Sequence, residues 1–121
     1  MKTLPQLLRE IENVADFAEI EVGDANTRGL FNNYPLHVAA VWGDCEAIQL
    51  LVSAGARINQ RGEHGFTPLM EAVAQDHQEA AALLISLGAE PLRNDHGQLP
   101  SEYAQVGGNN QLAAYLVKHG F

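Results

Sequence analysis

The 121-residue chain has little cysteine, little positive charge and no long apolar run. Its one cysteine, Cys45, excludes an internal disulfide and is typical of a reducing compartment, so we expect a cytoplasmic location. Seven Lys and Arg against fifteen Asp and Glu give a net charge of −8, which disfavours nucleic acid and anionic membranes as partners. A basic partner protein would suit this charge, although acidity also simply serves solubility. No apolar segment is long enough for a signal peptide or a membrane span.

A short pattern recurs along the chain. Its central copy is Gly65-Phe66-Thr67-Pro68-Leu69-Met70-Glu71-Ala72, followed by Leu83-Leu84 and Gly88-Ala89. The matches 33 residues earlier are Pro35, Leu36, Ala39, Leu50-Leu51 and Gly55-Ala56. The matches 32 residues later are Gly97, Pro100, Ala104, Leu116 and Gly120. A period near 33 with this many coincidences indicates a repeat array.

The pattern resembles the ankyrin repeat. Residues 32–39 and 65–72 are similar to its Gly-x-Thr-Pro-Leu-His-x-Ala start, and residues 50–56 to its Leu-Leu-x-x-Gly-Ala end. The resemblance covers about residues 26–121. It implies an all-α solenoid of about three helix-turn-helix repeats with hairpin-like connectors and a helical N-terminal cap. About three repeats are enough to bury a continuous core.

We expect a single domain over residues 1–121. Its parts would be an N-terminal cap and connector (1–31), a first repeat (32–64), a second repeat (65–96) and a C-terminal capping repeat (97–121). The last segment is polar where the others are apolar or small, as the outer face of a terminal repeat should be. These polar residues are Gln98, Ser101, Gln105, Asn109, Asn110 and Gln111.

The cap should begin with a helix. Thr3 followed by Gln6 is a capping-box pattern, and Pro5 is tolerated in a first turn. An apolar stripe at helical spacing comprises Leu4, Leu7, Leu8 and Ile11. Residues 14–22 fit either a second helix or an extended arm.

The repeats predict three further helix pairs. First helices, each opened by a proline, are expected at about 35–42, 68–75 and 100–106, and second helices at about 45–54, 78–87 and 110–119. Left-handed glycines should follow the second helices at Gly55, Gly88 and Gly120. Asn32 should adopt the same left-handed conformation as Gly65 and Gly97. The predicted core is Leu36, Ile48, Leu50, Leu51, Leu69, Leu83, Leu84, Leu112 and Leu116.

No repeat carries the family's complete Thr-Pro-Leu-His. In the family the Thr caps the first helix, and the His ties neighbouring connectors together through backbone hydrogen bonds. Here the first repeat keeps His37 but has Tyr34 for Thr, and the second keeps Thr67 but has Met70 for His. The last has Leu99 and Glu102. Loss of a cap costs about 1 kcal/mol, so we expect moderate stability.

The resemblance also implies a binding surface on the concave face, formed by the connector tips and the exposed side of each first helix. The matching positions are Leu30, Phe31, Asn33, Val38, Val41 and Trp42; Glu63, His64, Phe66, Glu71, Ala74 and Gln75; and Asp95, His96, Gln98, Tyr103 and Val106. A strip of apolar side chains with acidic residues beside it on this face would suit a protein partner. Alternatively, Phe31 and Phe66 fold back on the connectors and Trp42 packs on the next repeat.

Residues capable of catalysis or metal binding are present, but not in a pattern that builds a site. His64 and His96 occupy equivalent connector tips, yet two ligands do not make a metal site. Cys45 opens a helix, where its pKa could be lowered, but no His adjoins it in the sequence. The chain has no phosphate-binding glycine loop, His-Glu-x-x-His or Gly-x-Ser-x-Gly motif. We expect no enzymatic activity, no cofactor and no metal.

The expected function is therefore a protein–protein interaction module. One alternative is an immunity or inhibitor protein that neutralises a cognate toxin or enzyme, because small stand-alone ankyrin-repeat proteins suggest a bacterial source. Another is an excised or engineered binding module. Exposed aromatic residues could also drive self-association, so a monomer and a weak homodimer both fit the sequence.

Overall fold

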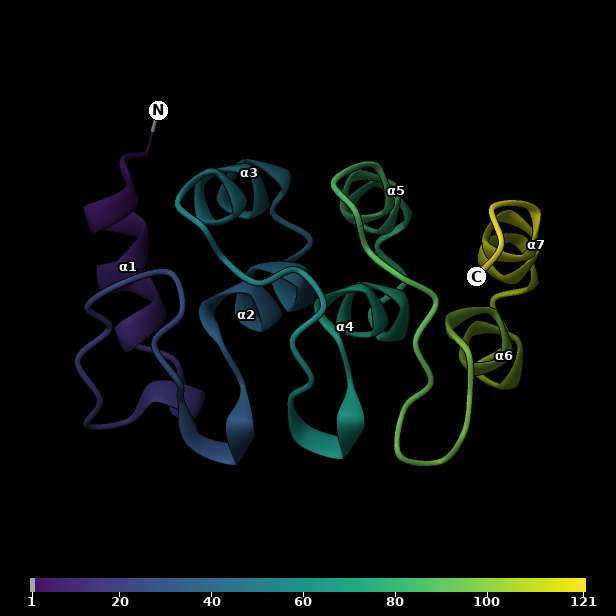
Figure 1. Ribbon diagram of the computed structural model, residues 1–121, viewed down its shortest axis with the longest axis horizontal. Helices are drawn as coiled ribbons and strands as arrows, with labels where there is room; N and C mark the ends of the chain where they lie inside the picture. The colour runs from purple at the N-terminus through teal and green to yellow at the C-terminus, as the bar shows by residue number, and fades with distance from the viewer. Residues whose placement is uncertain (1) are drawn as a thin grey trace.

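The computed structural model describes residues 2–121, and these residues contain helices but no strand. Six of the helices form two layers (Figure 1). The inner layer is α2 (Pro35–Trp42), α4 (Pro68–Ala74) and α6 (Pro100–Val106), and the outer layer is α3 (Cys45–Ser53), α5 (Gln78–Ser86) and α7 (Asn110–Lys118). Inner helices pack on one another in the order α2, α4, α6, and each packs on its outer partner. This is the all-α repeat solenoid that the sequence predicts.

The helix ends agree with the sequence pattern to within one residue. Prolines open all three inner helices, where a missing N–H breaks no hydrogen bond. After the outer helices the backbone turns left-handed at Gly55, Gly88 and Gly120, with φ of 94°, 113° and 88°. The next N–H then returns to the helix, as from Ala56 to the carbonyl of Leu51 at 2.9 Å. The predicted glycine caps are confirmed.

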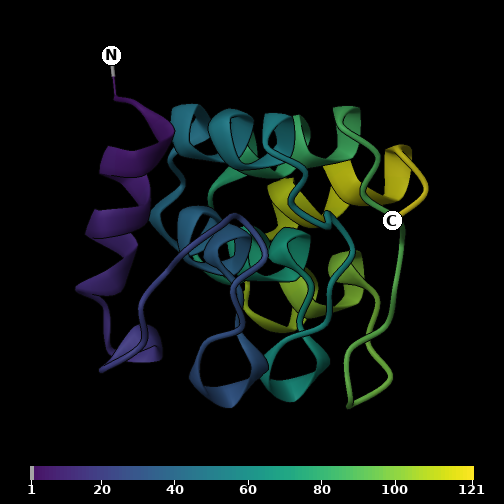
Figure 2. The same cartoon turned by 60° about the vertical axis from the view of Figure 1, so that its left-hand side comes forward.

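The connectors project from one side of the stack as a row of loops (Figures 1 and 2). Asn32 has φ of 64°, close to 71° at Gly65, which confirms their equivalence. Phe31 and His64, one residue earlier, are left-handed as well, with φ of 59° and 61°. This second left-handed residue was not predicted, because the conformation is uncommon outside glycine and rare for a bulky residue such as Phe.

The N-terminal cap consists of α1 (Leu4–Glu12), which lies across the end of the stack and packs on α2 and α3 (Figure 2). Its capping box is confirmed, because the Gln6 N–H donates to Thr3 Oγ1 at 3.3 Å and the Thr3 N–H donates to Gln6 Oε1 at 2.9 Å. The buried stripe of α1 is Leu7, Leu8 and Ile11. No helix among residues 2–121 has the length and apolar character needed to cross a membrane.

Residues 14–22 form an arm with a single 3-10 turn at Ala15–Phe17. Phe17 is fully buried and fixes the arm to the body of the protein. Its ring lies so close to Gly29 that a Cβ there would be 2.8 Å from it, which excludes a larger residue. Tertiary packing of one aromatic side chain thus decides between the two conformations that the sequence left open.

The core runs without a break through all the repeats. Seven of the nine predicted core residues are fully buried, whereas Leu50 and Leu83 are only half-buried. Three large buried residues were not predicted: Phe17, Met70 and Phe121. Met70 occupies the position that the family's His takes in a complete repeat, and its apolar side chain fills the buried space there.

Candidate protein-binding surface

The candidate surface, here called the inner face, is the solvent side of α2, α4 and α6 together with the connector tips. Residues three and four apart on a helix share one side of it. The aligned positions are Val38, Val41 and Trp42 on α2; Glu71, Ala74 and Gln75 around the end of α4; and Tyr103, Val106 and Gly107 around the end of α6. The repeat period places equivalent residues side by side across the three helices.

Several large apolar side chains on the inner face are exposed. Phe31 at the first connector tip exposes 61% of its surface, Trp42 exposes 38% and Val106 77%. Leu30 and Val41 are exposed as well. Phe31 therefore does not fold back on its connector. Phe66 does so in part, because it is half-buried and meets the ring of Tyr103 edge-on at 5.2 Å.

Two predicted surface residues are buried instead. Asn33 is 4% exposed, because its Nδ2 donates to Asp16 Oδ2 at 3.1 Å and its Oδ1 accepts the Glu63 N–H at 3.0 Å. Val38 is 5% exposed and belongs to the continuous core, on a helix flanked by α1 and α4. Neither is available to a partner, and Asn33 serves to position its neighbours.

The polar candidates gather at the connector tips. The exposed ones are Glu63, His64, Asp95 and His96, with Gln75 exposed at the end of α4 and Gln98 half-buried. The second and third tips are joined, because the Asp95 N–H donates to the His64 carbonyl at 3.0 Å. Among residues 2–121 no three His, Cys, Asp or Glu side chains are grouped so as to hold a metal ion. The tips present hydrogen-bonding groups and charge.

A shallow groove of about 180 Å³ runs between α4 and α6. Its lining is mostly apolar or small: Val73, Ala74, Asp76, Tyr103, Ala104, Val106 and Gly107. Tyr103 joins this groove to Phe66 and hence to the second connector. The groove and the aromatic pair thus form one continuous apolar patch.

Glu71 stands in the same row as Tyr103 and is half-buried. Burial raises the pKa of Glu71 to about 7, and the nearby charges of Asp16 and Glu63 add to the rise. Its carboxylate has no hydrogen bond and no ion pair with any residue from 2 to 121. It is therefore an acid that titrates near neutral pH without a partner.

Buried polar side chains hold the connectors in register. His37 Nδ1 accepts the Tyr34 N–H at 3.0 Å, so its Nε2 carries the proton and donates to the Phe66 carbonyl at 2.9 Å. Burial lowers the pKa of His37, which keeps the ring neutral for this arrangement. The tie between connectors that the family resemblance implies is confirmed. Because it fixes the backbone of Phe66, it also positions the aromatic pair.

Asn26 and Asn59, which lie one repeat period apart in the sequence, form further ties between connectors. Asn26 donates to the Gly55 carbonyl at 2.9 Å and accepts the Arg57 N–H at 3.0 Å. Asn59 repeats this one connector later, with Gly88 at 3.4 Å and Glu90 at 2.9 Å. An Asn recurring at the repeat period was the signal from which this role could have been predicted.

The helix caps and the cysteine agree only in part with expectation. Tyr34 makes no side-chain cap, whereas Thr67 Oγ1 accepts the Met70 N–H at 3.3 Å. Cys45 is half-buried, and its pKa is raised and not lowered as its place at a helix start could suggest. Burial is the main cause, and the carboxylates of Glu79 and Asp44 add to it. The helix N-terminus is outweighed, so the thiol is not activated.

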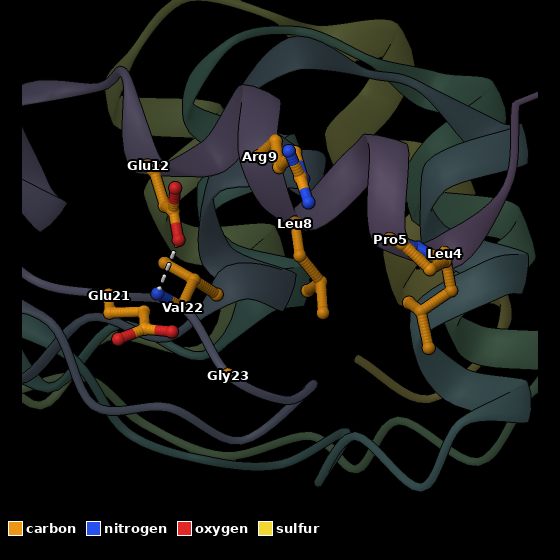
Figure 3. A pocket seen from close by; sticks show the side chains of 8 residues that line it. All are labelled: Leu4, Pro5, Leu8, Arg9, Glu12, Glu21, Val22 and Gly23. Carbon is orange, nitrogen blue, oxygen red and sulfur yellow. Dashed lines mark hydrogen bonds between the residues drawn. The ribbon is translucent and has the colours of Figure 1, made fainter.

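A second hollow, of about 550 Å³, lies between α1 and the arm (Figure 3). Its lining is Leu4, Pro5, Leu8, Arg9, Glu12, Glu21, Val22 and Gly23. The Glu12 carboxylate accepts the Val22 N–H at 2.9 Å, as Figure 3 shows. One of its acids is therefore already used to hold the arm against the helix, unlike Glu71 on the inner face.

Comparison with known proteins agrees with this geometry. A family profile described as ankyrin repeats in three copies matches residues 6–95. The chain belongs to the ankyrin-repeat family. Human protein phosphatase 1 regulatory subunit 27 is 47% identical over 68 residues, which are 55% of this chain and 44% of that protein. Mouse rabankyrin-5 is 36% identical over 86 residues, 69% of this chain and 7% of that one.

The ankyrin-repeat chain thus spans less than half the length of these curated relatives. Both relatives are eukaryotic, so they give no support to the expected bacterial source. The profile ends at residue 95, before α6 and α7, although that pair continues the two layers. The expected boundaries between repeats stay predictions.

Proposed function

We propose that the protein binds a partner protein through its inner face. Ankyrin repeats in general mediate protein–protein interaction, and the relatives include a regulatory subunit. The observation that supports the inner face is its exposed apolar side chains, above all Phe31, Trp42 and Val106. Apolar groups gathered on one face of a small acidic protein are typical of an interaction surface.

The first connector tip supports the proposal by its conformation. Phe31 combines a φ of 59° with the largest exposure of any aromatic residue in the described chain. A left-handed backbone costs a non-glycine residue about 1–2 kcal/mol. Because the ring is exposed, its burial does not offset this cost. A role outside folding explains why a bulky ring stands there.

A finer version of this function is inhibition or regulation of an enzyme. The relative named protein phosphatase 1 regulatory subunit 27 is a regulatory subunit by its name. The net charge of −8 would favour a basic target, as an immunity protein against a toxin would need. Purified partner separates the two roles: an inhibitor lowers the activity of the partner, and an adaptor leaves it unchanged.

The test is affinity capture from cells of the source organism with the wild type and three inner-face variants, Phe31→Ala, Trp42→Ala and Val106→Ser. The control matched to Val106→Ser is Val117→Ser, which makes the same substitution at an exposed site on α7. We expect a partner that the wild type and the control capture equally and that the inner-face variants lose. Circular dichroism melts confirm that each variant is folded. A partner retained equally by all five proteins would place the binding surface elsewhere.

Self-association is the competing use of the same apolar groups. Light scattering of the wild type and Trp42→Ala over a concentration series decides it. A dimer that the variant abolishes would make the inner face a contact between copies of this chain.

A further inference from the structure

The groove between α4 and α6 is apolar, and a half-buried acid lies just outside it. Phe66, itself outside the lining, meets the ring of Tyr103, which lines the groove, edge-on at 5.2 Å. Glu71 does not line the groove but precedes Ala74, which does, by one helical turn, and it occupies the place on α4 that Tyr103 has on α6. The two helices pack directly on one another (Figure 1). A chain lying in the groove therefore meets apolar contacts along its length and a carboxylate just beyond its end.

Two negative charges act on Glu71, those of Asp16 and Glu63. Two cationic side chains, one on the second connector and one on the third, are engaged with other groups. Arg61 donates to the Arg93 carbonyl at 2.5 Å. Arg93 in turn pairs with Glu102 at 3.1 Å. Within residues 2–121 no cationic side chain pairs with Glu71, so its natural complement must come from outside.

The acid at the far end of the groove differs. Asp76 Oδ1 accepts a hydrogen bond from Asn109 Nδ2 at 2.9 Å, so its polar demand is met within the fold. Glu71 has no such bond. A ligand that complements the groove therefore carries a positive charge near Glu71 and an apolar side chain against Ala74 and Val106.

We propose that this groove receives an extended segment of the partner in which an Arg or Lys pairs with Glu71 and lies against Phe66 and Tyr103, while an apolar side chain two residues away packs on Val106. This rests on the proposed function. A cation over an aromatic face gains attraction beyond the ion pair, and partial burial strengthens both. Glu71 and Ala74 are separated by about 4.5 Å along their helix, and an extended chain rises about 3.3 Å per residue. Successive side chains of an extended chain point to opposite faces, and those two positions apart share a face at about 6.6 Å. One extended segment can therefore place two side chains, two positions apart, at the two sites.

A selection from a random displayed 12-residue peptide library tests the proposal without knowledge of the partner. The wild-type protein is the bait, and selected peptides are synthesised and their affinities measured by calorimetry at pH 8. We expect the peptides to share a basic residue with an apolar residue two positions away, and a Gln in place of that basic residue to weaken binding at least tenfold.

The protein variants complete the test. Glu71→Gln should weaken binding of the unmodified peptide at least tenfold and leave the affinity of the Gln-substituted peptide unchanged. Glu79→Gln is the matched control, because it removes the same charge from an exposed site on α5 and should change affinity less than twofold. Val106→Ser should weaken binding, and Val117→Ser should not.

Three other results would overturn the proposal. Peptides that need Trp42 and Phe31 but carry no basic residue would leave the inner face as the binding surface and remove Glu71 from it. Peptides equally well bound by Glu71→Gln would do the same. Selection of no peptide that depends on any inner-face residue would contradict both this inference and the proposed function.

Discussion

The two junctions between repeats are built with opposite chemistry. The first junction, between the first and second repeats, is tied by the buried polar side chains of Asn33 and His37. The second junction, between the second and third repeats, has the apolar Met70 at the place equivalent to His37. Its cross-connector hydrogen bonds, such as Asp95 to His64, lie between exposed residues. Nevertheless the inner helices pack on one another at both junctions (Figure 1).

The difference separates what a repeat needs in order to stack from what it needs in order to present a surface. Apolar burial is enough for stacking, because it is not directional. Hydrogen bonds to the backbone fix particular groups, and those of the first junction fix the Phe66 carbonyl and the Glu63 N–H. The backbone that carries the candidate aromatic and acidic groups is therefore the one held by buried polar ties.

The largest effect is expected when the first junction is given the chemistry of the second. His37→Met keeps the volume but leaves the Tyr34 N–H unpaired and removes one of the two hydrogen bonds to the Phe66 carbonyl, whose other donor is the Gly62 N–H at 2.7 Å. The loss should lower the free energy of unfolding by about 2–4 kcal/mol. Urea denaturation measures it, with Met70→Leu as a control that should cost less than about 1.5 kcal/mol. Equal losses in the two variants would show that the polar tie is not special.

The same residue gives the first junction a pH dependence. Burial holds the folded-state pKa of His37 below its ordinary value of 6.5, so protonation favours the unfolded chain. The contribution of His37 to stability is full above about pH 6.5 and is lost as the pH falls. The difference in stability between the wild type and His37→Met should therefore shrink in acid.

Asn33→Ala should have the next largest effect, about 2 kcal/mol, because it leaves the part-buried Glu63 N–H and Asp16 carboxylate without their partner. It should also weaken partner binding by displacing Glu63. Asn94, its nearest counterpart in burial on the third connector, bonds only to its own turn, so Asn94→Ala should reduce stability without affecting binding. A loss of binding in both variants would contradict the special role of the first junction.

Glu71→Gln should stabilise the protein. With a folded-state pKa of about 7 against an ordinary 4.5, Glu71 stays protonated in the folded chain while the unfolded chain ionises, so stability falls as the pH rises from about 4.5 to about 7. Discounted for partial exposure, the gain at pH 8 is about 1–2 kcal/mol, and it vanishes at pH 4.5. Thermal melts at both pH values measure it. The other titratable groups on this side are Asp16, Glu63 and His64, so His64→Gln serves as a control.

The smallest effect is expected at the exposed ties. Asn26→Ala and Asn59→Ala each remove two hydrogen bonds to backbone groups that water can replace, so each should cost about 1 kcal/mol. Because they occupy equivalent places in the two junctions, their costs should agree to within about 0.5 kcal/mol. A clearly larger loss at Asn26 would show that the first junction depends on its exposed ties as well.

Much of the fold could be predicted because the repeat period marks equivalent positions, and because the Pro and Gly residues at helix ends act through local backbone preferences. Pro35, Gly55 and their equivalents fix helix ends through backbone conformation alone. The arm could not be predicted, because its path depends on where the ring of Phe17 is buried. Packing between distant segments leaves no periodic signal in a stretch that occurs once.

The candidate site was predictable in outline and not in detail. Exposure of Phe31 and Trp42 followed from their places in the repeat, and burial of Asn33 and Val38 did not. Asn33 is buried by its bonds to Asp16 and Glu63, from two other segments of the chain. The raised pKa of Glu71 likewise depends on neighbours that the sequence separates by many residues.

Under the proposed function, the left-handed Phe31 places stability and recognition in opposition at one residue. A glycine there would relax the backbone at the first connector tip and remove an exposed ring. Selection for stability alone would therefore favour glycine at this position, and the proposed binding role is what would retain the ring. An evolved or designed variant of this protein that folds better should be examined first at this tip. Under the proposed function, Phe31→Gly would raise the melting temperature and weaken partner binding.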